Sequence, residues 1–319
     1  MSAAKIFSGT GSQDLADQIC KRYGSRPGKV NIQRFSDGEI LPTFMESIRG
    51  DFVFLVQSTH SPAENLMELL LMIDAAKRAS AYKIIAVIPY YGYARQDRKD
   101  RPRVAIGSKL IANMIQAAGA DRLITMDLHA PQIQGYFDIP VDHLYSLPVL
   151  IKYLRKELKG KTTVVSPDLG GLKMASAYAE ALHANLAIVA KERRSATETE
   201  ALYLIGEVEG RDVLLVDDLT ETAGTLTSAA ELLKKRGAQK IYAGVSHAVL
   251  VDIAVERLQK SQIAELVTTN STPVRAVKGF KTTVLCVSEL LGEGIKRIHN
   301  DESVSSLFNI ENGTNGKTG

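Results

Sequence analysis

The two halves of this chain repeat one pattern of strands and helices at a nearly constant spacing. The segment FVFLVQSTH at 52–60 matches DVLLVDDLT at 212–220, and RASAYKIIAVI at 78–88 matches KRGAQKIYAGV at 235–245. The offset between matched positions stays between 157 and 160 residues. A constant shift of this kind indicates an internal duplication, and 319 residues are enough for two separate cores. We therefore predict two similar α/β domains in tandem, joined near residues 145–160.

Short β-rich runs alternate with helical patterns along the chain. This alternation is typical of parallel sheets flanked by helices. Helices are expected at 63–79, where leucines and isoleucines form a stripe, and at 106–118. The expected strands are 52–56, 84–88, 123–126, 163–165, 186–189, 213–216, 241–245 and 283–287. The fold class is therefore α/β with mostly parallel sheets.

The run DVLLVDDLTETAGT at 212–225 predicts a sugar-phosphate site. An apolar strand ends in two adjacent carboxylates, Asp217 and Asp218, and a turn of small residues leads into a helix expected from Leu226. A helix N-terminus offers unsatisfied N–H groups and a positive dipole end to a phosphate, and the acids can accept hydrogen bonds from a diol. The alternative is an ordinary turn whose threonines only cap the helix. The phosphate-binding residues expected from this pattern are Thr222, Ala223, Gly224 and Thr225.

The first copy has lost this pattern, since Gln57 and Ser58 stand where the second copy has its acid pair. It offers other candidates. The segment 90–103, YYGYARQDRKDRPR, places five basic side chains beside three tyrosines, and clustered guanidinium groups can bind the phosphates of a nucleoside triphosphate. The alternative is a solvated loop or an RNA-binding patch. The turn FSDGE at 35–39 offers an aromatic face and two carboxylates for adenine.

Two side chains that follow strands are candidate magnesium ligands. His129 comes after the strand at 123–126, and Asp168 comes after the strand at 163–165. Mg²⁺ takes few protein ligands and completes its coordination with water and substrate phosphates. These two side chains would therefore be enough protein ligands for it. The alternative is that both residues are structural.

Composition excludes several classes of function. The chain has 39 basic and 36 acidic residues, a net charge of +3, which is too small to favour nucleic acid as the main partner. Cys20 and Cys286 have no spacing typical of a disulfide framework or a zinc site. No apolar stretch reaches the roughly 18 residues of a membrane span, and no leader pattern is seen. We expect a cytoplasmic protein without a membrane partner.

Six segments together resemble one known family across nearly the whole chain. They are FSDGE, ESIRG, YGYARQDRK, MDLHAPQIQGYFDIPVDHL, VVSPDLGG and VDDLTETAGT. The chain resembles ribose-phosphate diphosphokinase, also called phosphoribosyl pyrophosphate synthetase, of the phosphate-activated class. The resemblance implies transfer of the diphosphoryl group of ATP to the C1 hydroxyl of ribose 5-phosphate, which gives 5-phosphoribosyl 1-diphosphate and AMP. The alternatives are a phosphoribosyltransferase and a non-catalytic regulatory homologue.

The resemblance also implies roles for individual residues. It assigns Lys191 and Arg193, on a catalytic loop, to catalysis, His129 and Asp168 to Mg²⁺, and Asp217, Asp218 and 222–225 to ribose 5-phosphate. The ATP-binding residues that it implies are Phe35, Asp37, Glu39, Arg95, Gln96 and Asp97.

The resemblance further implies two tandem phosphoribosyltransferase-like domains. Residues 1–145 would form a degenerate N-terminal domain with the ATP elements and assembly surfaces. Residues 146–310 would carry the ribose 5-phosphate site and the catalytic loop, and 311–319 a disordered tail. The family implies self-association as a hexamer of dimers, with inorganic phosphate as activator at an effector site formed by Ser47, Arg49, Ser303 and Ser305. Alternatively, the two C-terminal serines only cap a terminal turn.

Overall fold

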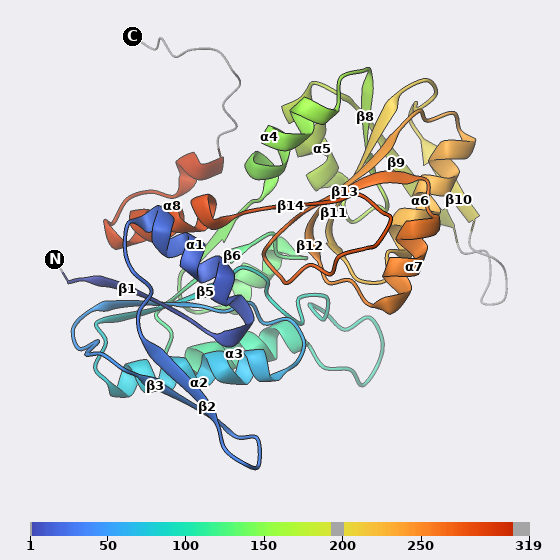
Figure 1. Cartoon of the computed structure of the whole chain (residues 1–319). Coiled ribbons are helices and arrows are strands. Elements are labelled where there is room, and N and C mark those ends of the chain that lie inside the picture. The colour runs from blue at the N-terminus through green and yellow to red at the C-terminus, as the bar shows by residue number, and fades with distance from the viewer. Residues whose placement is uncertain (1, 193–200, 309–319) are drawn as a thin grey trace, which may run out of the picture. The chain divides into compact units, whose positions relative to one another are not determined.

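The computed structural model describes residues 2–192 and 201–308, which form two compact units (Figure 1). The first unit comprises residues up to 146 together with 271–273 and 286–308, and the second comprises 147–270 and 274–285. The expected disordered tail, 311–319, lies outside the described residues.

The first unit is built on a five-stranded sheet in the order β1-β4-β5-β6-β7, in which all neighbouring strands are parallel. Helices α2 and α3 cover one face and helices α1 and α8 the other (Figure 1). The strands are β1 (Ala4–Ser8), β4 (Phe52–Val56), β5 (Lys83–Ile88), β6 (Arg122–Met126) and β7 (Val141–Leu144). The helices are α1 (Gln13–Tyr23), α2 (Glu64–Arg78), α3 (Gly107–Ala118) and α8 (Ser288–His299).

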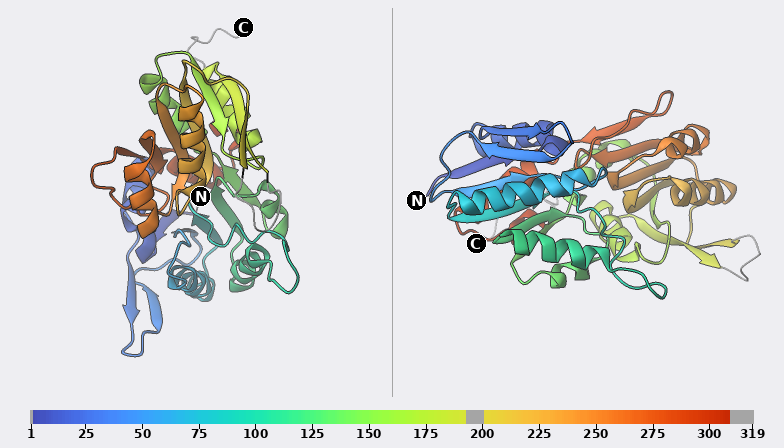
Figure 2. Two further views of the ribbon diagram at one scale, coloured as in Figure 1. Left: turned by 90° about the vertical axis from the view of Figure 1, so that its right-hand side faces the viewer. Right: turned by 90° about the horizontal axis from the view of Figure 1, so that it is seen from below.

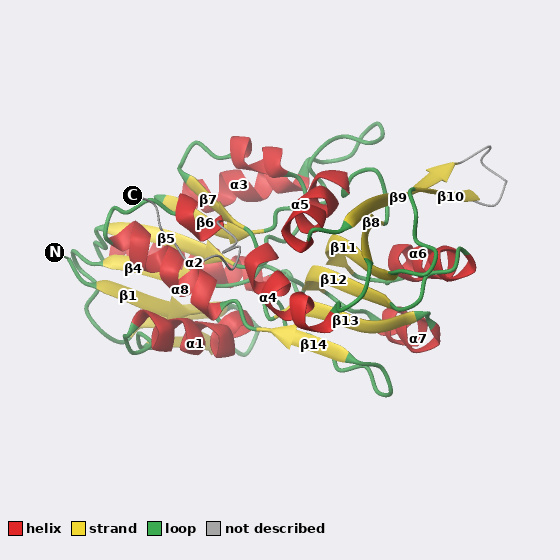
Figure 3. Cartoon of the chain, turned by 90° about the horizontal axis from the view of Figure 1, so that it is seen from above, coloured by secondary structure: helices red, strands yellow, loops and turns green. Residues whose placement is uncertain are grey.

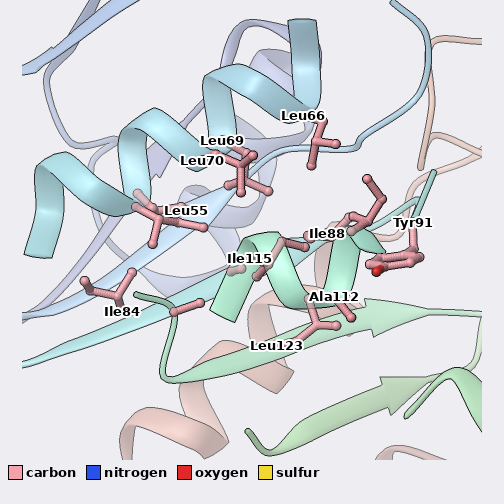
Figure 4. Packing of buried hydrophobic residues seen from close by; sticks show 14 of the residues in the cluster. Leu55, Leu66, Leu69, Leu70, Ile84, Ile88, Tyr91, Ala112, Ile115 and Leu123 are labelled. Carbon is pink, nitrogen blue, oxygen red and sulfur yellow. The ribbon is translucent and has the colours of Figure 1, made fainter. Parts of the chain in front are cut away.

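The strands of this sheet are apolar on both faces because helices cover both. On the face of α2 and α3, Leu55 packs with Leu69 of α2 and Ile115 of α3, and Tyr91 closes the cluster near the end of β5 (Figure 4). All four side chains are at most 2% exposed. Strands buried on both faces read as continuous apolar runs, which explains why the sequence predicted them.

An antiparallel hairpin of β2 (Val30–Arg34) and β3 (Ile40–Phe44) extends away from the first sheet (Figure 2). Its turn is the FSDGE segment. The amide of Phe35 donates to the carbonyl of Glu39 at 2.9 Å, and Gly38 has a φ of +96°, the left-handed region that favours glycine.

The second unit has a seven-stranded sheet in the order β10-β9-β8-β11-β12-β13-β14, parallel except for the β9–β10 pair. Helices α6 and α7 pack on one face and α4 and α5 on the other (Figure 3). The strands are β8 (Thr162–Ser166), β9 (Asn185–Glu192), β10 (Ala201–Ile205), β11 (Asp212–Thr220), β12 (Ile241–Ala248), β13 (Ile263–Thr269) and β14 (Thr282–Leu285). The helices are α4 (Leu147–Glu157), α5 (Leu172–Leu182), α6 (Gly224–Lys235) and α7 (Asp252–Lys260).

The expected domain division needs one correction, because 286–308 belongs to the first unit and not to the C-terminal one. Helix α8 packs along α1: Leu291 and Ile295 are fully buried, and the Tyr23 hydroxyl lies 3.0 Å from Nδ1 of His299. At Gly292, an added Cβ would lie 3.3 Å from Cβ of Arg22, so the two helices approach closely. Burial of this apolar stripe decides which unit the helix joins.

No helix in residues 2–192 and 201–308 is both long enough and apolar enough for a membrane span.

Candidate active site

The central strand β11 marks a reversal in the strand order of the second sheet. Strand β8 is followed along the chain by β9 on one side, and β11 is followed by β12 on the other. Loops at the carboxyl ends of β8 and β11 therefore diverge, and such a topological switch point is where open α/β sheets bind ligands. In the first sheet the order runs from β1 to β4, β5, β6 and β7 without a reversal, and the β2–β3 hairpin follows β1.

The acid pair lies at the carboxyl end of β11. Oδ1 of Asp217 accepts a hydrogen bond from the amide of Asp218 at 2.9 Å. Burial, and then repulsion from Asp218 and from Asp168, raise the pKa of Asp217 well above its usual value. The predicted strand ended at 216, whereas β11 runs on to Thr220 because its register with β12 continues to Ala248.

The loop after β11 leads directly into helix α6. Ala223 is buried with a φ of +56°, a left-handed conformation that is rare for residues with a Cβ and occurs at functional sites. Helix α6 begins at Gly224, two residues before the expected start. The amide of Gly224 lies 3.4 Å from Oγ1 of Thr222, and Thr227 donates to the carbonyl of Ala223 at 2.9 Å. The N–H groups of this first turn can therefore receive a phosphate.

Asp168 lies on the turn after β8, beside β11. The Ser166 hydroxyl donates to its carbonyl at 2.7 Å, and its Oδ1 accepts the amide of Gly171 at 3.1 Å. Strands β8 and β11 pair up to Val165 and Leu215, so the turn that carries Asp168 lies next to the carboxyl end of β11, and repulsion from Asp168 contributes to the raised pKa of Asp217. The structure thus brings together three predicted acids at the switch point.

The predicted catalytic pair falls at the edge of what the structure describes. Lys191 pairs through its backbone with Leu202 in the β9–β10 ladder, and its side chain is not described. Arg193 lies outside the described residues.

The basic segment after β5 is held down by a close backbone contact. Gly92 donates to Oγ1 of Thr59 at 2.7 Å, and an added Cβ would come within 2.1 Å of the Thr59 carbonyl oxygen. Tyr93 has a φ of +63°, and the buried Tyr91 hydroxyl donates to the carbonyl of Ser108 at 2.9 Å. The backbone near 91–94 is therefore held in place, while the five basic side chains of the segment are exposed.

Arg95 and Gln96 are exposed on this loop, whereas Asp97 is buried. Oδ2 of Asp97 accepts from Nε2 of Gln132 at 3.1 Å, and its carbonyl accepts from the Tyr136 hydroxyl. The structure therefore gives Asp97 an anchoring role within the loop.

The other predicted ATP residues lie at the tip of the β2–β3 hairpin. Phe35 is 52% exposed, and Oδ1 of Asp37 accepts the amide of Glu39 at 3.1 Å. In Figure 1 the hairpin extends away from the sheet of the first unit.

His129 is exposed just past the carboxyl end of β6. Two residues earlier, Asp127 has a φ of +41° and accepts the amide of Ser146 at 3.0 Å, which fixes the turn. Within the described part of the chain, no three His, Cys, Asp or Glu side chains form a group that could hold a metal ion.

The predicted effector residues all lie in the first unit, in two local networks. Nη1 of Arg49 donates to Oγ of Ser80 at 3.2 Å, and the carbonyl of Ser47 accepts from Nζ of Lys5. Ser303 has different partners: its carbonyl accepts from Arg297 at 2.8 Å, and its hydroxyl accepts the amide of Ser305 at 3.2 Å.

A polar hollow of about 350 Å³ lies at the amino ends of β8 and β9, where α4 and α5 end. Its cations include Arg155, which donates to the Ala181 carbonyl at 2.9 Å. Cations at helix C-termini complement the negative end of the helix dipole. The hollow thus has a structural explanation and lies away from the switch point.

Comparison with known proteins identifies the family of the chain. Residues 4–119 match the family model described as the N-terminal domain of ribose phosphate pyrophosphokinase, and 193–309 match the phosphoribosyl synthetase-associated domain. The chain is 52% identical over 304 residues to a ribose-phosphate pyrophosphokinase of Porphyromonas gingivalis, covering 95% of this chain and 97% of that one. Identity to the Chlorobaculum tepidum protein of the same name is 50% over 309 residues, covering 97% and 96%.

The chain belongs to the ribose-phosphate pyrophosphokinase family. A crystal structure of phosphoribosylpyrophosphate synthetase from Mycobacterium smegmatis also superposes, with a TM-score of 0.88 at 37% identity, covering 94% of this chain and all of that one. The predicted fold class is confirmed by this match. The predicted function is confirmed as well: this pyrophosphokinase makes 5-phosphoribosyl 1-diphosphate from ATP and ribose 5-phosphate.

Sequence reasoning missed one polar residue that contacts the predicted phosphate loop. Arg257 of α7 donates from Nη1 to the carbonyl of Thr222 at 3.1 Å. It belongs to an ordinary amphipathic helix 35 residues further along the chain, so no local motif singles it out.

Proposed function

We propose that this pyrophosphokinase binds ribose 5-phosphate at the switch point of its second unit. In this assignment Asp217 and Asp218 accept hydrogen bonds from the ribose diol, and 222–225 bind the phosphate. The observation that carries the proposal is the left-handed Ala223 between the acid pair and the first turn of α6. This conformation turns the chain so that the helix amides follow directly after the carboxylates.

The first unit supplies the ATP-binding residues in this proposal. Arg95 and Gln96 are exposed on a loop that Gly92 and Asp97 anchor, and an exposed guanidinium can bind phosphate oxygens bidentately. At the hairpin tip, the Phe35 ring is exposed for stacking, and Asp37 and Glu39 are the proposed partners of the adenine amino group.

Mg²⁺ is the proposed cofactor, with His129 and Asp168 as protein ligands. The Asp168 carboxylate fits this ion, which takes one or two carboxylates and leaves most of its coordination sphere to water and substrate phosphates. The repulsion that raises the pKa of Asp217 is also the setting that a divalent cation relieves. When bound, Mg²⁺ supplies neutralisation of the phosphate charges.

The chain's own residues then act mainly by positioning. The C1 hydroxyl of ribose 5-phosphate attacks the β-phosphorus of ATP, the bond between the α,β-bridging oxygen and that phosphorus breaks, and AMP leaves. Holding sugar and nucleotide in one orientation makes this step effectively unimolecular. Lys191 and Arg193 are the proposed cations that meet the charge developing on the transferred group.

Substrate titrations of variants in each unit test the assignment. Changes at the acid pair of the second unit should move only the ribose 5-phosphate curve, and Arg95→Ala in the first unit should move only the ATP curve. If Arg95→Ala instead shifts the ribose 5-phosphate curve alone, the division of substrates between the units is wrong.

We also propose that the enzyme belongs to the phosphate-activated class and assembles as a hexamer of dimers, with Ser47, Arg49, Ser303 and Ser305 as effector residues. The supporting observation is that Arg49 already donates to a hydroxyl, that of Ser80, at 3.2 Å. An arginine beside hydroxyl groups is a typical phosphate pocket.

Inorganic phosphate should therefore raise both activity and assembly of the wild type, because a ligand that binds the active state better stabilises it. Arg49→Ala should need at least about tenfold more phosphate, the loss expected for one charge-assisted hydrogen bond. Activity and sedimentation across phosphate concentrations check this, with Arg78→Ala as the control, since Arg78 pairs with Asp74 on the surface of α2. A wild type that is active and monomeric without phosphate, or an Arg49→Ala variant that responds normally, would contradict the proposal.

A further inference from the structure

Arg257 places a positive charge against the loop that begins α6. Its helix α7 is fixed by Ala254 and Leu258, which are fully buried in the core of the second unit. With α7 held in this way, the guanidinium reaches the loop between β11 and α6. Nη1 donates to the carbonyl of Thr222 at 3.1 Å.

The same guanidinium lies directly beside the first residue of α6. An ideal Cβ added to Gly224 would lie 2.9 Å from Nη1 of Arg257, so the glycine leaves the space that the guanidinium uses. Ala223, between the two contacted residues, is the left-handed residue of the loop. One arginine therefore contacts the loop on both sides of its least favourable backbone conformation.

We propose that Arg257 is a positioning residue for the phosphate of ribose 5-phosphate. It holds the 222–224 turn in its binding conformation through the Thr222 carbonyl and adds a positive charge to the partial charge of the α6 N-terminus. Its effect is selective for the phosphate end of the substrate. This inference rests on the proposed ribose 5-phosphate site and extends it with a residue from a separate helix.

A purely structural role makes a different prediction. Arg257 is also in the last turn of α7, where a cation complements the helix dipole. If that were its whole role, replacement would lower stability and affect both substrates alike. A phosphate-positioning role changes the KM for ribose 5-phosphate, spares ATP and depends on ionic strength.

The test compares Arg257→Ala, Arg257→Lys and the wild type in steady-state kinetics. Arg257→Ala should raise the KM for ribose 5-phosphate at least about tenfold, with kcat and the KM for ATP within about twofold of wild type. Arg257→Lys keeps the positive charge but loses the planar guanidinium, so its KM for ribose 5-phosphate should lie between those of Arg257→Ala and the wild type. The difference in KM for ribose 5-phosphate between Arg257→Ala and the wild type should become smaller as the salt concentration rises from about 0.05 M to about 0.5 M, because the Debye length then falls to a few ångströms.

Ribose, which lacks the phosphate, separates the two ends of the site. As a competitor of ribose 5-phosphate, it should inhibit Arg257→Ala and the wild type with the same constant. Arg236→Ala is the matched control, because it removes one arginine at the other end of α6 and should leave all constants unchanged.

Three results for Arg257→Ala would overturn the inference. They are an unchanged KM for ribose 5-phosphate, an inhibition constant for ribose that rises as much as this KM, and a KM for ATP that rises as much as this KM. A different result would show that the proposed ribose 5-phosphate site itself is wrong. In that case the acid-pair variant Asp217→Ala, Asp218→Ala would keep its normal ribose 5-phosphate titration. Thermal unfolding of each variant, compared with Arg236→Ala, identifies any loss that comes from misfolding.

Discussion

Replacing Lys191 and Arg193 together by alanine should lower kcat by about a thousandfold, the scale seen when a cation that stabilises a phosphoryl-transfer transition state is removed. The KM values for ATP and ribose 5-phosphate should stay close to wild type, because cations that meet the phosphates only as the reaction proceeds contribute little to ground-state binding. Steady-state kinetics with both substrates varied measures the two effects separately.

The control for this pair is Lys235→Ala, Arg236→Ala, which removes the same charges at the C-terminal end of α6. It should turn over at the wild-type rate. If the KM for ATP rises in the Lys191, Arg193 variant while kcat stays near wild type, both residues bind ground-state nucleotide and the catalytic assignment is wrong.

Removing the acid pair should act on the sugar. Asp217→Ala with Asp218→Ala should raise the requirement for ribose 5-phosphate at least about tenfold, since each charge-assisted hydrogen bond contributes about 1.5 to 3 kcal/mol. ATP binding should remain nearly intact. Titration of both substrates checks this, and Asp212→Ala is the control, because it removes a carboxylate from the opposite end of the same strand.

The unfolding temperature of the acid-pair variant distinguishes loss of substrate binding from loss of the fold. The pKa of Asp217 is raised by burial and by its acidic neighbours. An acid whose pKa is raised on folding stabilises the fold while it is protonated, and this contribution is lost as the pH rises through the folded-state pKa. At neutral pH in metal-free buffer, losing the repelled carboxylate should therefore not lower the unfolding temperature. An unchanged ribose 5-phosphate titration in a folded double variant would remove the acid pair from the site.

The sequence predicted the parts of the fold in which burial dictates the pattern. Strands such as 52–56 and 241–245 are covered on both faces, so they read as apolar runs that end in turns. The β2–β3 hairpin was missed because most of its side chains are exposed or half-exposed, and because Pro42 lies within β3. The short β7 and the strands β10 and β13 were also not predicted.

Other differences depend on contacts between segments distant in sequence. The predicted strand 283–287 is shorter in the structure, where β14 ends at Leu285 and α8 begins at Ser288. That α8 joins the first unit depends on its packing against α1, which no local pattern encodes.

The site shows the same division between local and long-range information. The acid pair and the 222–225 loop were readable because strand, acids and small residues are contiguous. The left-handed backbone of Ala223 was not, since alanine ordinarily favours the right-handed region. Arg257 reaches the loop only because α7 packs beside α6, so its place depends on the tertiary fold.

The central claim is that this chain transfers an intact diphosphoryl group. The most direct measurement incubates the purified protein with ATP, Mg²⁺ and ribose 5-phosphate and quantifies the nucleotide and sugar products over time. The account predicts that AMP and 5-phosphoribosyl 1-diphosphate appear in equal amounts and only when ribose 5-phosphate is present. Accumulation of ADP in place of AMP, or AMP formation that does not depend on ribose 5-phosphate, would contradict it.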